Sequence, residues 1–306
     1  MRRNRQPFFL WMILCSGVLA GCYQSRKAQL SEQLQPVKTE IRAKDSSLNV
    51  LKEKMQFKLQ NADVDTGISN RVGSTIQQFQ YRNDSLQKRV IVMDSLMSKR
   101  KSLRKTYKKI LTVEAQSLAA VITDSIMSHR QQVVFKMVDD VLDKAKQNMF
   151  NLAAFFAPGE FTIPDSSMAL VDTMFGPLLD SLIVFSNKYA QLPREATLSF
   201  YGYADGQPIH PESALAQTLT SLGNLQQPTA ADLNRELSRL RAEAMSKALH
   251  QLYEQRKSRF LNPELLDAVD IIIGMGEQYP NSRITDYQVD DERRRIVLFY
   301  WSVLPK

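Results

Sequence analysis

The chain has 306 residues and a formal net charge of +8, and it contains only two cysteines. This length is enough for one or two domains. Both cysteines, Cys15 and Cys22, lie within the first 22 residues, which excludes a fold held together by several disulfides.

The N-terminal segment predicts export. Residues 1–6 contain three arginines and no acid, and residues 7–18 form an apolar run that is shorter than the about 20 residues of a membrane-spanning helix. The following Leu19-Ala20-Gly21-Cys22 resembles the end of a bacterial lipoprotein signal peptide. The resemblance implies cleavage after residue 21 and lipidation of Cys22. The alternative is an ordinary signal peptide with a chance cysteine.

Lipidation would hold the mature chain on a membrane, because each buried methylene contributes about 0.8 kcal/mol and two acyl chains anchor a protein stably. Tyr23 follows the cysteine and no acidic run comes after it. By resemblance to the sorting rules of such lipoproteins, this favours the periplasmic face of the outer membrane. Loss of Arg2, Arg3 and Arg5 with the signal peptide lowers the formal charge from +8 to +5. For an exported lipoprotein we expect no nucleic-acid partner.

A coiled-coil stalk is predicted over residues 22–112. Apolar residues recur every seven positions over 26–62 and over 74–110, and the turn-rich segment 61–73 separates the two helices. The helices either fold back as an antiparallel hairpin or continue end to end, and the sequence leaves both open. Such a region either binds an envelope protein partner or is a helical bundle without one. The repeating residues are Leu30, Leu34, Val37, Ile41, Leu48, Leu51 and Met55, then Ile76, Phe79, Leu86, Val90, Met93 and Met97.

Seven cations crowd residues 99–109. They either form a solvated helix face or contact anionic glycan, lipid head groups or an acidic partner. Beyond them, a broad apolar stripe from Leu118 to Leu142 predicts a connecting helix within residues 113–157. Pro158-Gly159 is expected to end this helix.

Residues 158–306 change character. Strand-like runs at 196–203, 269–273 and 295–301 alternate with predicted helices at 167–189 and 230–255. The expected fold class is therefore α+β, with long N-terminal helices followed by an α/β sandwich in which helices pack on a mixed sheet.

Three motifs of this domain resemble the OmpA-like peptidoglycan-associating domain, and they occur in the family's order. Tyr201-Gly-Tyr-Ala-Asp-Gly206 is similar to the family's strand that ends in Gly-x-Thr-Asp. Residues 234–242 match Asn-x-x-Leu-Ser-x-x-Arg-Ala at every fixed position, and residues 274–280 are similar to Gly-x-Gly-Glu-x-x-Pro. Residues 293–296 resemble the family's closing Arg-Arg-Val strand. The resemblance covers about half of the mature chain.

The resemblance implies non-covalent binding of cell-wall stem peptides, chiefly those that contain diaminopimelate. The free end of diaminopimelate carries an ammonium and a carboxylate on one carbon. Asp205 matches the family position that accepts from the ammonium. Arg241 matches the position that holds the carboxylate, for which a planar guanidinium is suited and an amine is not. Asn234, Leu237 and Tyr203 are expected to complete the peptidoglycan site.

The closing strand is expected to support the site with one cation. Arg293, Arg294 and Arg295 are the candidates, and Arg294 is the one we favour. An alternative for each of the two principal residues remains open. Asp205 is otherwise a turn residue, and Arg241 is otherwise an exposed helix cation.

Two departures from the family pattern bear on the site. Ala204 stands where the family has Thr, so one hydroxyl is missing. The insertion 207–228, with a short helix expected at 212–222, is longer than the family's loop. It is a lid, a partner surface or a tolerated insertion, and if it fills the pocket, wall binding is lost.

The sequence carries no recognisable catalytic constellation, metal-ligand spacing or phosphate-binding glycine loop. We expect a protein that is not an enzyme and that holds no metal and no cofactor. The expected function is a tether between the outer membrane and peptidoglycan. The alternative is an envelope scaffold whose coiled coil binds another protein and whose C-terminal domain has diverged from wall binding.

Overall fold

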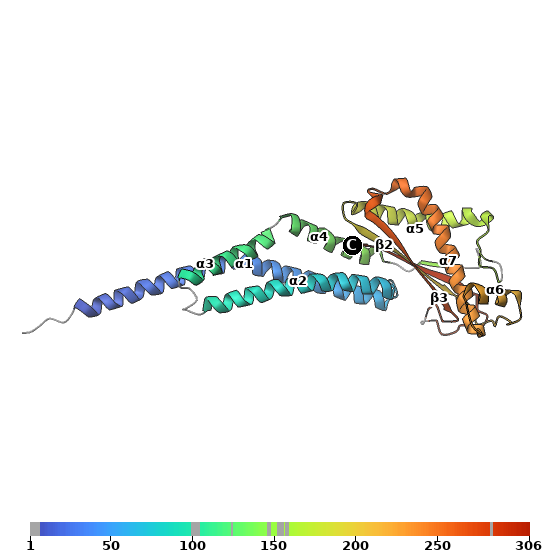
Figure 1. Ribbon diagram of the computed structural model, residues 1–306, viewed down its shortest axis with the longest axis horizontal. Helices are drawn as coiled ribbons and strands as arrows, with labels where there is room; N and C mark the ends of the chain where they lie inside the picture. The colour runs from blue at the N-terminus through green and yellow to red at the C-terminus, as the bar shows by residue number, and fades with distance from the viewer. Residues whose placement is uncertain are drawn as a thin grey trace, which may run out of the picture. The chain divides into compact units, whose positions relative to one another are not determined.

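The computed structural model describes residues 7–98, 105–123, 125–145, 148–151, 156, 159–281 and 284–306 (Figure 1). Side chains are described for 28–98, 109–121, 129–145, 156, 159–281 and 284–306. The chain divides into two compact units. The helical unit comprises residues 1–54 and 73–135, and the sheet unit comprises residues 55–72 and 136–306.

Four helices build the helical unit and lead out of it. They are α1 (Pro7–Gln60), α2 (Thr66–Ser98), α3 (Lys105–Thr123) and α4 (Ser125–Lys144). The predicted seven-residue repeat is confirmed, because its apolar positions on α1 and α2 form one core with α3. The buried residues of this core are Leu30, Leu34, Val37, Ile41, Val90, Met93, Met97, Leu111, Ala115 and Leu118.

The first two helices run side by side as an antiparallel hairpin (Figure 1). Lys38 Nζ lies 2.7 Å from an Asp94 carboxylate oxygen, and the Asn83 amide donates to the Ile41 carbonyl oxygen at 3.1 Å. Lys38 pairs with Asp94, whereas Ile41, further along α1, pairs with Asn83, which is earlier in α2. The two helices are therefore antiparallel. The structure therefore decides between the two arrangements that the sequence left open.

Helix boundaries differ from the prediction at three places. The break between α1 and α2 is shorter than 61–73, because the Asp65 carboxylate accepts from the Ile68 backbone N–H at 2.6 Å and starts α2 there. A continuous helix over 74–110 is wrong, since Arg89 of α2 donates to Glu114 of α3 at 2.8 Å, whereas 25 residues of one helix would separate them by about 37 Å. Most of the predicted basic run lies outside the described side chains.

The third predicted helix is also wrong at its C-terminal end. Its described parts are α3 and α4, and α4 ends at Lys144. Residues 148–151 are instead a strand, because they pair antiparallel with residues 296–299. The sequence pattern predicted a helix there. Backbone hydrogen bonding to a segment almost 150 positions away makes it a strand instead.

The sheet unit contains four strands in the order β1-β4-β2-β3. They are β1 (Asn148–Asn151), β2 (Arg194–Tyr203), β3 (Leu266–Gly276) and β4 (Ile296–Pro305). The β2 and β3 strands are parallel, whereas β4 is antiparallel to both of its neighbours. The expected α+β class with a mixed sheet is confirmed.

Helices α5 (Met168–Lys188) and α7 (Ala230–Arg256) contact the sheet, and α6 (Ala214–Leu222) contacts α7. A capping box of Thr229 and Asp232 starts α7, as the predicted N-cap requires. Short 3₁₀ turns complete the unit at Asp165–Ser167, Lys257–Arg259, Pro263–Leu265 and Glu292–Arg294.

Two glycines let α7 lie against the sheet. A Cβ atom on Gly202 would stand 2.0 Å from the Ser238 carbonyl oxygen, and one on Gly274 would stand 2.2 Å from the Arg235 carbonyl oxygen. Both obstacles are backbone atoms of α7 and cannot move aside. The glycines of the first and third family-like motifs are therefore required by the approach of the helix that carries the second motif.

The end of the α1–α2 hairpin covers the opposite face of the sheet. Successive residues of a strand face opposite sides, so Tyr201 faces away from α7. Its hydroxyl donates to an Asp65 carboxylate oxygen at 2.8 Å, and Arg71 Nη1 donates to the Thr197 hydroxyl at 2.8 Å. The sheet therefore lies between the helical hairpin end and the pair α5 and α7.

Among the described residues, one helical stretch, Asp165–Lys188, is long and apolar enough to cross a membrane. Several of its apolar side chains are buried within the sheet unit, including Phe175, Leu182 and Ile183. The Phe175 ring contacts the Phe299 ring of β4 edge-on, with centroids 6.2 Å apart. A core helix explains this composition.

We predict opposite effects for alanine at two glycines. Gly202→Ala should lower the free energy of unfolding by about 3 kcal/mol, because the new methyl group meets α7 backbone. Gly73→Ala should raise it by about 0.5–1 kcal/mol, because no heavy atom lies within 4 Å of its added Cβ and alanine favours the helix. Urea denaturation followed by circular dichroism measures both, and equal stability of Gly202→Ala and the wild type would contradict the packing described.

Candidate ligand-binding site

Asp205 lies just after the end of β2, where the strand leaves the sheet. Its Oδ2 atom is 3.2 Å from Arg295 Nε, at the start of β4, and only 13% of its side chain is exposed. Its Oδ1 atom accepts from the Gln207 backbone N–H at 3.4 Å. Asp205 is therefore both a turn residue and the anionic member of a partly buried ion pair.

Arg241 lies on the side of α7 that is buried, with 6% of the residue exposed. Among the described residues it donates one hydrogen bond, from Nε to the Glu160 carbonyl oxygen at 2.9 Å. Its guanidinium carbon lies 5.7 Å from the centre of the Phe156 ring. The alternative of an exposed helix cation is thus excluded for Arg241.

A half-buried arginine lies on the same part of α7. Arg239 forms ion pairs at 2.7 Å with Glu236 and at 2.9 Å with Glu243. The two arginines are two positions apart on one helix and face different surroundings, which makes Arg239 a natural control for Arg241.

Electrostatics join three groups into one cluster. Burial lowers the pKa of the Arg241 guanidinium to about 10, the Asp205 carboxylate opposes this shift and the Arg295 cation adds to it. Arg241 and Arg295 therefore both face the Asp205 carboxylate in a partly buried place. A second, exposed carboxylate oxygen, Glu292 Oε1, lies 3.5 Å from Arg295 Nη2.

The arginine next to Asp205 is not Arg294, which we expected to support the site. Arg295 is the member beside Asp205. Arg294 is 5% exposed and donates to backbone carbonyl oxygens of the preceding loop, at 2.5 Å to Glu277 and at 3.2 Å to Val289. Arg294 therefore secures the loop next to the site, and its contact with a ligand stays a prediction.

This loop carries an ordered stack of rings. The Tyr279 and Tyr287 rings are parallel with centroids 5.3 Å apart, and the Arg294 and Arg293 guanidinium groups lie over Tyr279 and Tyr287 at 4.9 and 5.3 Å, respectively. The Val289 carbonyl oxygen of the same loop accepts from the Gly206 backbone N–H at 2.6 Å. The stack thus holds the loop against the turn that contains Asp205.

Asn234 connects three segments around the site. Its amide nitrogen donates to the Gln207 carbonyl oxygen at 3.0 Å and to Glu277 Oε1 at 2.8 Å. It therefore links the start of α7 to the turn after β2 and to the turn after β3. Asn234 acts here as a support for the site.

Leu237 and Tyr203 are also buried. Leu237 packs in an apolar cluster with Leu219 of α6 and Leu233 of α7, so it fixes the start of α7 and the insertion. Tyr203 is 7% exposed, and burial raises the pKa of its hydroxyl. The structure places both residues in the supporting core, and their contact with a ligand stays a prediction.

Three contacts that support the site were not predicted from the sequence. The Ser238 hydroxyl, a fixed position of the second motif, accepts from the Gly276 backbone N–H at 3.0 Å. The motif serine was visible in the sequence, but its partner was not. Phe156 and Glu160 come from a segment without any motif, so nothing in the sequence signalled that they would cover Arg241.

The insertion 207–228 folds as an ordered element, and the short helix expected there is confirmed as α6. Its Ala216 and Leu219 are buried against the N-terminal part of α7. Phe156 and Glu160 contact Arg241. The insertion lies beside the start of α7, and its role as a lid, a partner surface or a tolerated insertion stays a prediction.

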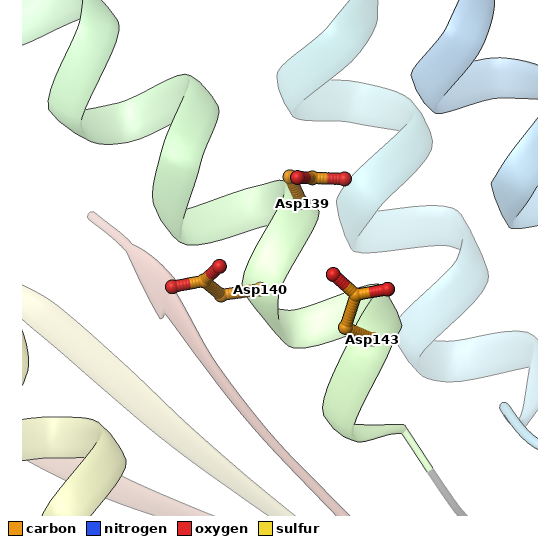
Figure 2. Close-up of side chains that lie close together, drawn as sticks. All are labelled: Asp139, Asp140 and Asp143. Carbon is orange, nitrogen blue, oxygen red and sulfur yellow. The ribbon is translucent and has the colours of Figure 1, made fainter.

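Three carboxylates near the end of α4 lie close together (Figure 2). Asp139, Asp140 and Asp143 each offer an oxygen within 4.8 Å of the others. Asp140 is already neutralised, because Lys136 Nζ lies 2.7 Å away and Lys188 also contacts it. This cluster is an ion-pair network that ties α4 to the end of α5, and it is not evidence of a metal site.

The predicted lipidation site, Cys22, lies within helix α1. Its side chain is not among those described. Cleavage after residue 21 and lipidation of Cys22 therefore stay predictions.

No protein-family model matches the chain, and no curated protein matches it. Among solved structures, a MotB-like protein from Desulfovibrio vulgaris is similar at a TM-score of 0.29 and 16% identity, over 51% of this chain and 72% of that one. A likeness at this TM-score carries no argument about the function of the chain.

We predict that acid stability depends on Asp140. Burial raises the pKa of Asp140, but hydrogen bonds from Lys136, Lys188 and Tyr189 lower it further, so that the net pKa lies well below its ordinary value. A depressed carboxyl pKa stabilises the fold above the unfolded value of about 3.9, and this contribution is lost as the pH falls through the folded value.

Asp140→Asn should therefore lower the free energy of unfolding by about 1.5–3 kcal/mol at pH 7 and reduce its dependence on pH below about 4. Urea denaturation between pH 2 and pH 7 measures both effects. Asp290→Asn, at an exposed carboxyl group, serves as the control. An Asp140→Asn variant with the stability and pH profile of the wild type would refute this role.

Proposed function

We propose that the sheet unit binds an amino-acid head group that carries one carboxylate and one ammonium, as at the free end of diaminopimelate in peptidoglycan stem peptides. The observation that carries the proposal is the convergence of Asp205, Arg241 and Arg295 from three different elements. All three residues lie in segments that resemble the family, and the sequence favoured Arg294 in place of Arg295.

The charges of the cluster suit such a ligand. Arg241 uses its Nε for the Glu160 carbonyl oxygen, so a ligand carboxylate would meet the two Nη groups of the fork. Charge-assisted hydrogen bonds to a planar guanidinium are strong and directional. The carboxylate would also balance the positive charge whose burial lowers the pKa of Arg241.

Asp205 would receive the ammonium of the ligand. Its Oδ2 faces Arg295, whereas Oδ1 is held only by a long contact of 3.4 Å from the Gln207 N–H. Oδ1 is therefore the oxygen that an ammonium would use. A ligand with both charges on one carbon would contact the anion and the cation at once, whereas a simple carboxylate would contact only the cations.

The wider role that we propose is a lipid-anchored tether. Cys22 would carry the lipid on the periplasmic face of the outer membrane, and the sheet unit would hold the wall without making or breaking bonds. Each contact with a stem peptide would be modest, but the wall repeats its stems, and a high effective concentration makes attachment persistent.

We predict that wall binding requires Arg241 and Asp205. Arg241→Met and Asp205→Asn should each reduce co-sedimentation with purified diaminopimelate-type cell walls by about tenfold or more, since a hydrogen bond to a charged group is worth about 1.5–3 kcal/mol. Arg241→Lys should also weaken binding, because an amine cannot hold a carboxylate with two parallel bonds.

Arg239→Met is the matched control, since it removes a cation from the same helix at a place already paired with Glu236 and Glu243. It should sediment with walls like the wild type. Circular dichroism confirms that each variant is folded. If Arg241→Met and Asp205→Asn bind walls as well as Arg239→Met does, the tether is wrong and the scaffold alternative gains support.

We predict that Cys22→Ser moves the protein from the membrane fraction to the soluble periplasmic fraction, because the lipid would be its main attachment to the membrane. Cell fractionation followed by immunoblotting measures the change. Membrane association that persists in Cys22→Ser cells would show that another segment anchors the chain.

A further inference from the structure

Glu277 lies one position after the end of β3, beside the turn that contains Asp205. The strands β2 and β3 are parallel neighbours, and at their ends the Ala204 backbone N–H donates to the Gly276 carbonyl oxygen at 2.7 Å. Neighbouring strands of a sheet lie about 4.8 Å apart. Asp205 and Glu277 are the next residues after this hydrogen bond, so they leave the sheet side by side.

The contacts of Glu277 fix its position. Gly276 precedes it with a φ of +57°, a left-handed conformation that glycine adopts without strain and that turns the chain. Arg294 Nη2 donates to the Glu277 carbonyl oxygen at 2.5 Å, and the Asn234 amide donates to Glu277 Oε1 at 2.8 Å. Among the described residues, no group donates to the other carboxylate oxygen, Oε2. Glu277 is therefore an acid that is held in place and has one oxygen left to accept.

Hydrogen bonds connect the carboxylates of Asp205 and Glu277. Asp205 Oδ1 accepts from the Gln207 backbone N–H at 3.4 Å. The Asn234 amide nitrogen then joins the Gln207 carbonyl oxygen, at 3.0 Å, to Glu277 Oε1. One backbone residue and one side-chain amide therefore link the two acids and set their separation.

The ammonium of the proposed ligand needs more than one acceptor. An ammonium carries three N–H donors, and taking a charged group out of water is costly unless its hydrogen bonds are replaced. Asp205 has Oδ1 to offer, because its Oδ2 faces Arg295. A second acceptor beside Asp205 is therefore required.

Two acids are candidates for this second acceptor. The Glu292 side chain is 77% exposed, and its Oε1 lies beside Arg295. Glu277 is partly buried and is held by Asn234, so it loses less conformational freedom when a ligand binds. We propose that Glu277 accepts from the ligand ammonium together with Asp205 and determines specificity for a head group that carries an ammonium beside its carboxylate. This inference rests on the proposed function of the same site.

Two tripeptide probes test the inference by isothermal titration calorimetry. L-Ala-γ-D-Glu-meso-diaminopimelate carries both charges at its free end. The same tripeptide with 2-aminopimelate in place of diaminopimelate keeps the terminal carboxylate and lacks only the ammonium. The full chain with Cys22→Ser, in mild detergent, should bind the diaminopimelate probe at least about tenfold more tightly, because hydrogen bonds between charged groups are strong.

Glu277→Gln should remove most of this preference. The glutamine amide oxygen can still accept from the Asn234 amide, so the support of α7 is kept and only the charge is lost. Affinity for the diaminopimelate probe should fall about tenfold, and affinity for the aminopimelate probe should stay unchanged. Asp290→Asn is the matched control, since it removes an exposed charge from the following loop, and it should change neither affinity.

Four outcomes would overturn the inference. Equal losses of affinity for both probes in Glu277→Gln would mean that Glu277 only supports the fold. If Asp205→Asn loses the preference and Glu277→Gln keeps it, the proposed function stands without this role of Glu277. Loss of the preference in Glu292→Gln instead of Glu277→Gln would assign the second acceptor to Glu292. A chain that binds neither probe overturns the inference and the proposed function together.

Discussion

The approach of α7 to the sheet is the constraint on which the C-terminal part of the molecule depends. Gly202 and Gly274 leave room for the α7 backbone, and a methyl group at either position would overlap a carbonyl oxygen. The Ser238 hydroxyl then accepts from the Gly276 N–H. This hydrogen bond fixes the position of α7 along β3. With α7 in this place, Arg241 lies close enough to Asp205 for the carboxylate to raise its pKa against the effect of burial. Three motifs that are separate in the sequence are therefore parts of one packing arrangement.

The same arrangement brings charged groups together in a partly buried place. A buried guanidinium is costly unless anions compensate it, and Asp205 is shared between Arg241 and Arg295. The protein supplies a carbonyl oxygen and an aromatic ring to Arg241, which satisfy part of the group without neutralising it. The exposed Glu292 carboxylate, 3.5 Å from Arg295, is the second anion beside these two arginines.

The two structural units do not follow the order of the chain. Residues 55–72, from the end of α1 to the start of α2, belong to the sheet unit and cover the face of the sheet opposite α7. The helical hairpin is therefore part of the C-terminal unit at one end, while its remaining length forms the helical unit. The described part of the helical unit leaves apolar side chains in water on α2 and α3, although elsewhere its seven-residue repeat is buried in the usual way.

The sequence by itself determined the α+β class, the heptad core of α1 and α2, the N-cap of α7 and the existence of α6, because these features depend on local periodicity and capping. It also singled out Asp205 and Arg241, since their motifs lie on short continuous segments. Only the tertiary structure decided that the helices form a hairpin, that residues 148–151 are a strand and that Arg295 is the arginine beside Asp205. Each of these depends on contacts between residues far apart in the chain. The sequence alone does not distinguish Arg294 from Arg295. In the folded chain their side chains point in different directions, so that Arg295 contacts Asp205 and Arg294 contacts the preceding loop.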